Sequence, residues 1–95
     1  MEETVYMTKP GFAWGCVADD FTGASDAASF WADAGMRVLL VNGIPSFDAG
    51  QLQGYDGVVI ALKTRTAATD QAVSETLKSC RWLKAAGARQ LFIKY

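Results

Sequence analysis

The sequence predicts an α/β fold, with helices covering a mostly parallel sheet in three layers and a Rossmann-like topology. Short apolar runs alternate with stretches of helical periodicity, and no run alternates apolar with polar residues as a half-exposed strand would. Two segments of the chain also have similar sequences. "AGMRVLLV" and "AGARQLFI" share a helix end, a glycine, an arginine and an apolar strand. Strands joined in this order are expected to have right-handed crossovers.

Four apolar runs are predicted to be the strands of the sheet: residues 12–18, 37–41, 57–62 and 90–95. Each run is short and is bounded by glycine or polar residues, which is typical of strands that are buried on both faces. The glycine-containing stretch over residues 42–56 has no strong periodicity and is expected to be a connection.

Two segments have helical periodicity, residues 23–34 and 69–86. In each, apolar residues recur at the spacing of one helix face. Thr22 is expected to cap the first helix, because threonine hydroxyls accept hydrogen bonds from amides of the first turn. Gly35 and Gly87 are expected to supply the left-handed turns that end the two helices.

The composition is that of an ordinary globular domain. The chain has 95 residues, of which 51% are hydrophobic, and a net charge of -1, so nothing in its charge points to nucleic acid. It has no histidine, and its two cysteines, Cys16 and Cys80, lie far apart in apolar stretches, which argues against a structural zinc site.

No targeting or membrane segment is recognisable. Residues 1–11 are polar and lack the apolar core of a signal peptide, and no apolar run approaches the ~20 residues that span a bilayer. We therefore expect a cytoplasmic protein without membrane association, in which both thiols are reduced.

Polar clusters follow three of the predicted strands, at residues 19–20, 63–66 and 94–95. Because the carboxyl ends of parallel strands face the same crevice, these clusters are expected to converge. A polyhydroxy anion would use all three, since carboxylates accept hydrogen bonds from hydroxyls while Arg65 and Thr66 hold an acid group. The pattern therefore predicts a site for a small hydroxylated acid.

Each cluster also has a simpler interpretation. Asp19 or Asp20 could cap the helix that follows, because aspartate is among the preferred capping residues. Capping accounts for one aspartate and not for two. The basic residues could be a solvated strand end, where exposed ion pairs contribute only about 0–1 kcal/mol. No nucleotide site is expected, because the GxxxxGK[ST] and GxGxxG spacings are both absent.

Three segments carry a resemblance to a known family: "CVADDFTGASDAA", "VVIALKTRT" and "CRWLKAAGARQLFIKY". In this order and at these separations they closely resemble the N-terminal region of the four-carbon acid sugar kinase family. That family includes 3-oxo-tetronate 4-kinases and threonate or erythronate kinases. The resemblance runs from about Gly15 to Tyr95, and the DDxTGA and KTRT stretches are specific in combination.

The resemblance implies a much longer enzyme of two domains. Its N-terminal α/β domain would bind a four-carbon sugar acid of the threonate, erythronate or 3-oxo-tetronate type, and its C-terminal domain would bind ATP with Mg²⁺. Residues 1–11 would then be a tail and residues 12–95 the first part of the sugar-acid domain. That domain would be incomplete and the ATP-binding domain absent. The chain alone is therefore expected to be inactive and to hold no cofactor.

The resemblance also implies roles for individual residues. Two groups would bind the substrate: Asp19, Asp20, Thr22 and Gly23 in an aspartate turn, and Lys63, Arg65 and Thr66 at a basic strand end. Asp20 would be the catalytic carboxylate near the attacking hydroxyl oxygen, and Asp19 would orient the substrate or the turn. Arg65 would hold the C1 carboxylate, because its planar fork matches carboxylate geometry.

The rival interpretation is a non-catalytic α/β module that binds a small molecule, or an inactive fragment. A signalling receiver domain is disfavoured, because "KTR" stands where its phosphoacceptor aspartate would follow the third strand. A phosphatase of the DxDx[TV] type is disfavoured because "DDFTG" lacks that spacing. Apolar surface on such a short sheet also predicts a homo-oligomer.

Overall fold

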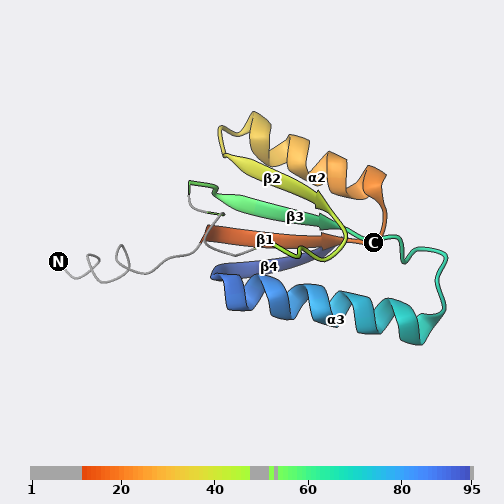
Figure 1. Ribbon diagram of the computed structural model, residues 1–95. Helices are drawn as coiled ribbons and strands as arrows, with labels where there is room; N and C mark the ends of the chain where they lie inside the picture. The colour runs from red at the N-terminus through yellow and green to blue at the C-terminus, as the bar shows by residue number, and fades with distance from the viewer. Residues whose placement is uncertain (1–11, 48–51, 53, 95) are drawn as a thin grey trace.

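A computed structural model describes residues 12–47, 52 and 54–94 (Figure 1). Its elements follow in the predicted order: β1 (Phe12–Ala18), α2 (Phe21–Asp33), β2 (Val38–Asn42), β3 (Gly57–Ala61), α3 (Thr69–Ala86) and β4 (Ala88–Lys94). The predicted tail, part of the predicted connection and Tyr95 lie outside the described residues. The fourth strand begins two residues earlier than predicted, since Ala88 already pairs with Phe12.

The strands form one parallel sheet in the order β2-β3-β1-β4. β1 is central and pairs in parallel with both β3 and β4, and β2 pairs in parallel with β3. The register places Trp14 beside Gly57 on one side and beside Gln90 on the other. The predicted α/β class with a parallel sheet is therefore confirmed.

The two helices cover opposite faces of the sheet, α2 above it and α3 below it in the view of Figure 1. The connection through α2 runs from β1 past β3 to β2, and the connection through α3 runs the other way, from β3 past β1 to β4. When two crossover connections have the same handedness but run in opposite directions across the sheet, their helices lie on opposite faces of the sheet. This topology produces the three layers.

Each face of the sheet has its own apolar core. The core under α2 comprises Trp14, Cys16, Ala18, Ala24, Ala27, Val59 and Ala61. The core under α3 comprises Val17, Leu52, Val58, Ile60, Leu62 and Leu83. β3 contributes to both and is buried at every position, as a central strand packed on both faces should be.

Two glycines allow close packing around β1. A Cβ at Gly57 would overlap the indole of Trp14, and a Cβ at Gly15 would lie 2.9 Å from Cδ1 of Leu83. The Trp14 indole packs against Trp31 of α2, with 3.8 Å between ring centroids. Glycine at these positions lets the helices lie directly on the sheet.

The predicted cap of the first helix is wrong. α2 begins at Phe21, and its N-cap is Asp20, whose Oδ1 accepts a hydrogen bond of 2.7 Å from the backbone N–H of Gly23. Thr22 lies inside the first turn instead, because the carboxylate directly after β1 already reaches the third amide of the helix. Gly87 ends α3 in the predicted left-handed conformation, with φ of 113°. Neither helix in the described part of the chain is long and apolar enough to cross a bilayer.

Candidate functional site

The candidate site lies at the carboxyl ends of β1 and β3. These strands are neighbours, yet the chain leaves β1 toward α2 on one face and leaves β3 toward α3 on the other. Such a reversal separates the two connections and leaves a crevice beyond the strand ends, which is where open parallel sheets bind ligands. The predicted polar clusters after β1 and β3 both fall at this crevice.

Backbone hydrogen bonds join the three strand ends at a single residue, Asp19. Its carbonyl oxygen accepts from the N–H of Thr64 at 3.1 Å and from that of Arg65 at 3.2 Å. Its own N–H donates to the carbonyl oxygen of Lys94 at 3.1 Å. The ends of β1, β3 and β4 therefore converge as predicted, and the main chain holds their side chains in place.

Both carboxylate oxygens of Asp20 are engaged. Oδ1 accepts the capping hydrogen bond from Gly23, and Oδ2 lies 2.5 Å from Nη1 of Arg65. The Gly23 N–H first, then the hydrogen bond and charge of Arg65 and the charge of Lys94, lower the pKa of Asp20, while desolvation opposes them. Asp20 is thus held as a carboxylate that shapes the turn and orients Arg65.

The side chains around this turn enclose a small polar cavity of about 190 Å³. Its lining residues are Asp19, Asp20, Thr22, Gly23, Asp26, Arg65 and Lys94. This volume lies below the roughly 300–1,000 Å³ of sites for drug-sized ligands. The polar cavity therefore suits a small ligand that carries both hydroxyl and anionic groups.

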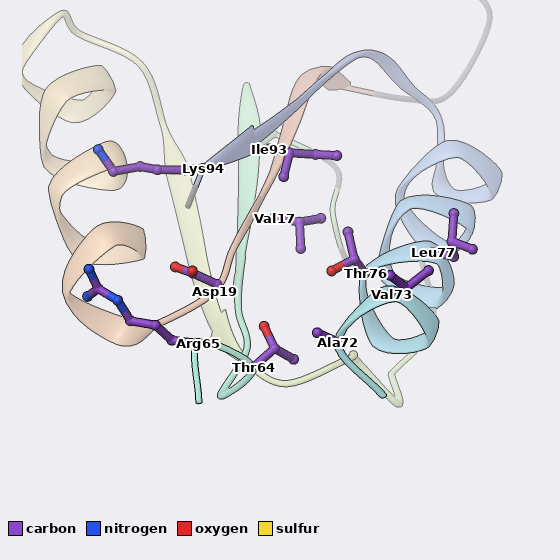
Figure 2. Close-up of a pocket in the computed structure, with 10 residues that line it drawn as sticks. All are labelled: Val17, Asp19, Thr64, Arg65, Ala72, Val73, Thr76, Leu77, Ile93 and Lys94. Atoms are coloured by element: carbon purple, nitrogen blue, oxygen red, sulfur yellow. The ribbon is translucent and has the colours of Figure 1, made fainter. Parts of the chain in front are cut away.

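A second cavity of about 290 Å³, the apolar groove, adjoins the polar cavity (Figure 2). Val17, Ala72, Val73, Thr76, Leu77 and Ile93 form most of it, and Asp19, Thr64, Arg65 and Lys94 form its polar end. Figure 2 shows the side chains of Arg65 and Lys94 on the side of α2, and the α3 residues on the opposite side. Asp19 lies between these two groups. Asp19, Arg65 and Lys94 line both cavities.

Most, but not all, of the predicted site residues come together. Five line the polar cavity: Asp19, Asp20, Thr22, Gly23 and Arg65. Lys63 and Thr66 are exposed and line neither the polar cavity nor the apolar groove. The cavity also includes Lys94, which the sequence placed in the polar cluster after the fourth strand without an individual role, and Asp26, to which sequence reasoning gave no role. Helical spacing could have identified Asp26, since it lies one turn after Thr22 on the same face of α2.

Other chemistries have little support in the described part of the chain. No three histidine, cysteine, aspartate or glutamate side chains are placed there so that they could hold one metal ion together. The Cys16 thiol is buried in the core under α2, and burial raises its pKa despite the opposing charge of Lys94. A neutral buried thiol is a poor nucleophile.

Sequence comparisons point to sugar-binding proteins. A family model described as the sugar-binding N-terminal domain matches residues 14–95. A 3-oxo-tetronate kinase from Pseudomonas fluorescens is 48% identical over 89 residues, which make up 94% of this chain and 21% of that relative. Another from Salmonella typhimurium is 43% identical over 81 residues, 85% of this chain and 19% of the relative.

Solved structures agree with the sequence relatives. A protein from Salmonella typhimurium superposes with a TM-score of 0.81 at 42% identity, covering 87% of this chain and 20% of that one. Haemophilus influenzae protein HI1011 has a TM-score of 0.79 at 40% identity, with coverages of 85% and 19%. The chain spans about one-fifth of the length of the curated relatives it matches. Because the family model matches residues 14–95, which is most of the chain, this chain belongs to the family of sugar-binding N-terminal domains.

Proposed function

We propose that this chain binds a four-carbon sugar acid in the polar cavity and is the substrate-binding part of an ATP-dependent kinase for such acids. The observation that carries the proposal is the convergence of carboxylates and cations on one small cavity at the topological switch point. Membership of the sugar-binding family and the kinase names of the relatives support the ligand class.

The cavity offers complementary groups for both ends of such a ligand. Asp19 and Asp26 carry carboxylates that accept hydrogen bonds from hydroxyl groups. Arg65 uses Nη1 for Asp20, and its remaining guanidinium N–H groups can donate to a carboxylate. The ion pair with Asp20 orients this guanidinium, which lowers the entropy that binding would cost.

The catalytic carboxylate has two candidates, and Asp20 is the one predicted from the sequence. In the structure the oxygens of Asp20 are engaged by Gly23 and Arg65. Among the described residues, no hydrogen bond to the carboxylate of Asp19 is found, although this residue lines both cavities. If Asp20 acts on the accepting hydroxyl, it does so through a lone pair that Gly23 and Arg65 leave unused. If it does not, Asp19 is positioned to take that role.

ATP and Mg²⁺ are proposed to bind outside this chain. The sequence has neither phosphate-binding loop, and no cluster of metal-ligating side chains is found in the described ranges. In the kinase, Mg²⁺ would neutralise the charge of the transferred phosphoryl group, while this chain would hold and orient the accepting acid.

Titration of the ¹⁵N-labelled chain with erythronate and threonate, followed by amide chemical shifts, tests the binding proposal. We expect saturable shifts at Gly23, Arg65 and Lys94. Arg65→Ala should weaken binding by about tenfold, as expected for loss of a hydrogen bond between charged groups. The matched control is Arg89→Ala, since Arg89 is an exposed arginine near the opposite end of β4. Absence of saturable shifts for both acids would overturn the proposal.

A further inference from the structure

Lys94, the last residue of β4, lies across the first turn of α2. A Cβ built at Gly23 would lie 3.4 Å from Cε of Lys94 and 3.0 Å from Oδ1 of Asp20. The absence of a side chain at position 23 therefore leaves room for the lysine stem and the capping carboxylate together. The main chain restrains the base of this lysine, because its carbonyl oxygen accepts the hydrogen bond from Asp19.

The ammonium group of Lys94 and the guanidinium of Arg65 differ in whether a carboxylate pairs with them. Both share the polar cavity with three aspartates, Asp19, Asp20 and Asp26. Arg65 is paired with Asp20, whereas no ion pair of Lys94 is found within the described part of the chain. Lys94 thus brings a positive charge to the cavity, and no ion pair with a described residue uses its three N–H donors.

Lys94 also stands where several cavities meet. It lines the polar cavity, the apolar groove and a third cavity of about 490 Å³ on the α2 face, beside Phe30, Trp31 and Phe92. Asp19 and Arg65 line only the first two of these. An anionic group entering from any of the three sides therefore meets the Lys94 side chain.

We propose that Lys94 is a specificity-determining residue that supplies the second cation for the acid group of the ligand and makes the site select sugar acids over neutral polyols. This inference rests on the proposed function and adds a residue and a selectivity to it. Arg65 orients the carboxylate through its planar fork, and Lys94 contributes a point charge from the other strand end.

The test compares erythronate with erythritol, a neutral polyol of the same carbon number, as ligands of the 95-residue chain. We expect the wild type to prefer erythronate by about tenfold or more, and Lys94→Met to remove most of that preference while keeping the apolar stem. Lys94→Arg should restore it in part, because it restores the charge. Lys78→Met is the matched control, since Lys78 is an exposed lysine on α3 outside all three cavities.

The possible outcomes separate this inference from the proposed function. If Lys94→Met keeps the full preference, or weakens both ligands equally, the selectivity role is wrong while sugar-acid binding stands. A wild type that binds both ligands equally also overturns only the role of Lys94. A wild type that binds neither overturns both proposals. Unchanged amide dispersion confirms that a variant is folded, and Lys94→Gln replaces Lys94→Met if that variant is not.

Discussion

Nη1 of Arg65 lies 2.5 Å from Oδ2 of Asp20, although the two residues are 45 positions apart in the chain. The contact joins the loop after β3 to the first turn of α2. The same carboxylate caps the helix through Gly23, so one side chain serves both the local fold and the candidate site. The predictions below separate these two roles.

The first prediction concerns stability against pH. Asp20 has a lowered pKa in the folded state, so its contribution to stability is present above the unfolded value of about 3.9 and is lost as the pH falls through the folded value. Wild type should therefore exceed Asp20→Asn in urea midpoint at pH 7, and the difference should shrink on acidification to pH 3. Asp33→Asn, at the exposed far end of the same helix, should keep the acid sensitivity of the wild type.

The second prediction concerns catalysis in a full-length kinase relative, at the positions that align with Asp20 and Arg65. The asparagine substitution should lower kcat by roughly 10² with a smaller change in KM, in the range typical of lost acid–base assistance. The alanine substitution should chiefly raise KM for the sugar acid, because it removes a contact present in both ground and transition states. Neither should change KM for ATP.

The same experiment decides between the two aspartates. If the variant aligned with Asp20 retains turnover and loses only thermal stability, its role is confined to capping α2. Loss of kcat in the variant aligned with Asp19 would then assign the catalytic carboxylate to that position. Steady-state kinetics and thermal unfolding of both variants make the comparison.

The third prediction concerns the nucleotide. Because the chain has neither phosphate-binding loop, it should not bind MgATP appreciably. Isothermal titration calorimetry of the 95-residue chain measures this directly. Saturable binding at ~μM affinity would contradict the proposal that ATP binds elsewhere, since such an affinity needs about 8 kcal/mol of binding free energy.

The fourth prediction concerns self-association. β4 is an edge strand with exposed apolar side chains on both faces: Leu91 and Phe92 are 38% and 43% exposed, and Ile93 is 49% exposed. Unpaired edges with apolar side chains favour pairing with another chain. We expect light scattering to show a dimer or larger oligomer whose population rises with protein concentration.

A charge on the β4 edge should reverse this association. Leu91→Lys places an ammonium group on the strand, which is a common device against edge pairing, and should shift the population to monomer. Ala32→Lys adds the same charge to an exposed position on α2 and should not. A wild type that stays monomeric at high concentration would show that the predicted homo-oligomer is wrong.

The fifth prediction concerns packing between β1 and α3. A Cβ at Gly15 would lie 2.9 Å from Cδ1 of Leu83, which is fully buried, so Gly15→Ala should destabilise the chain by about 1–3 kcal/mol. Leu83→Ala alone should cost about 2–5 kcal/mol through the cavity it leaves. In the double variant the added methyl group occupies part of that cavity, so denaturant unfolding should show a total cost below the sum of the two.

Local pattern was sufficient to predict the secondary structure of this protein. The fully apolar run of β3 indicated a strand buried on both faces, and the periodicity after Thr69 with glycine at position 87 gave the bounds of α3. These features depend on residues close together in sequence, so the sequence determines them directly. The convergence of the strand ends followed too, because all parallel strands present their carboxyl ends at one edge.

Only the tertiary structure decided what each polar side chain does. Thr22 and Asp20 are both good capping residues. Asp20 is the N-cap because the end of β1 places its carboxylate against the N–H of Gly23. Lys63 and Arg65 were both predicted to bind the substrate, but of the two only Arg65 forms an ion pair with Asp20 and lines the polar cavity. Lys94 entered the polar cavity because the strand order sets β4 beside β1. Such roles depend on distances between residues far apart in the chain, which spacing along the sequence does not encode.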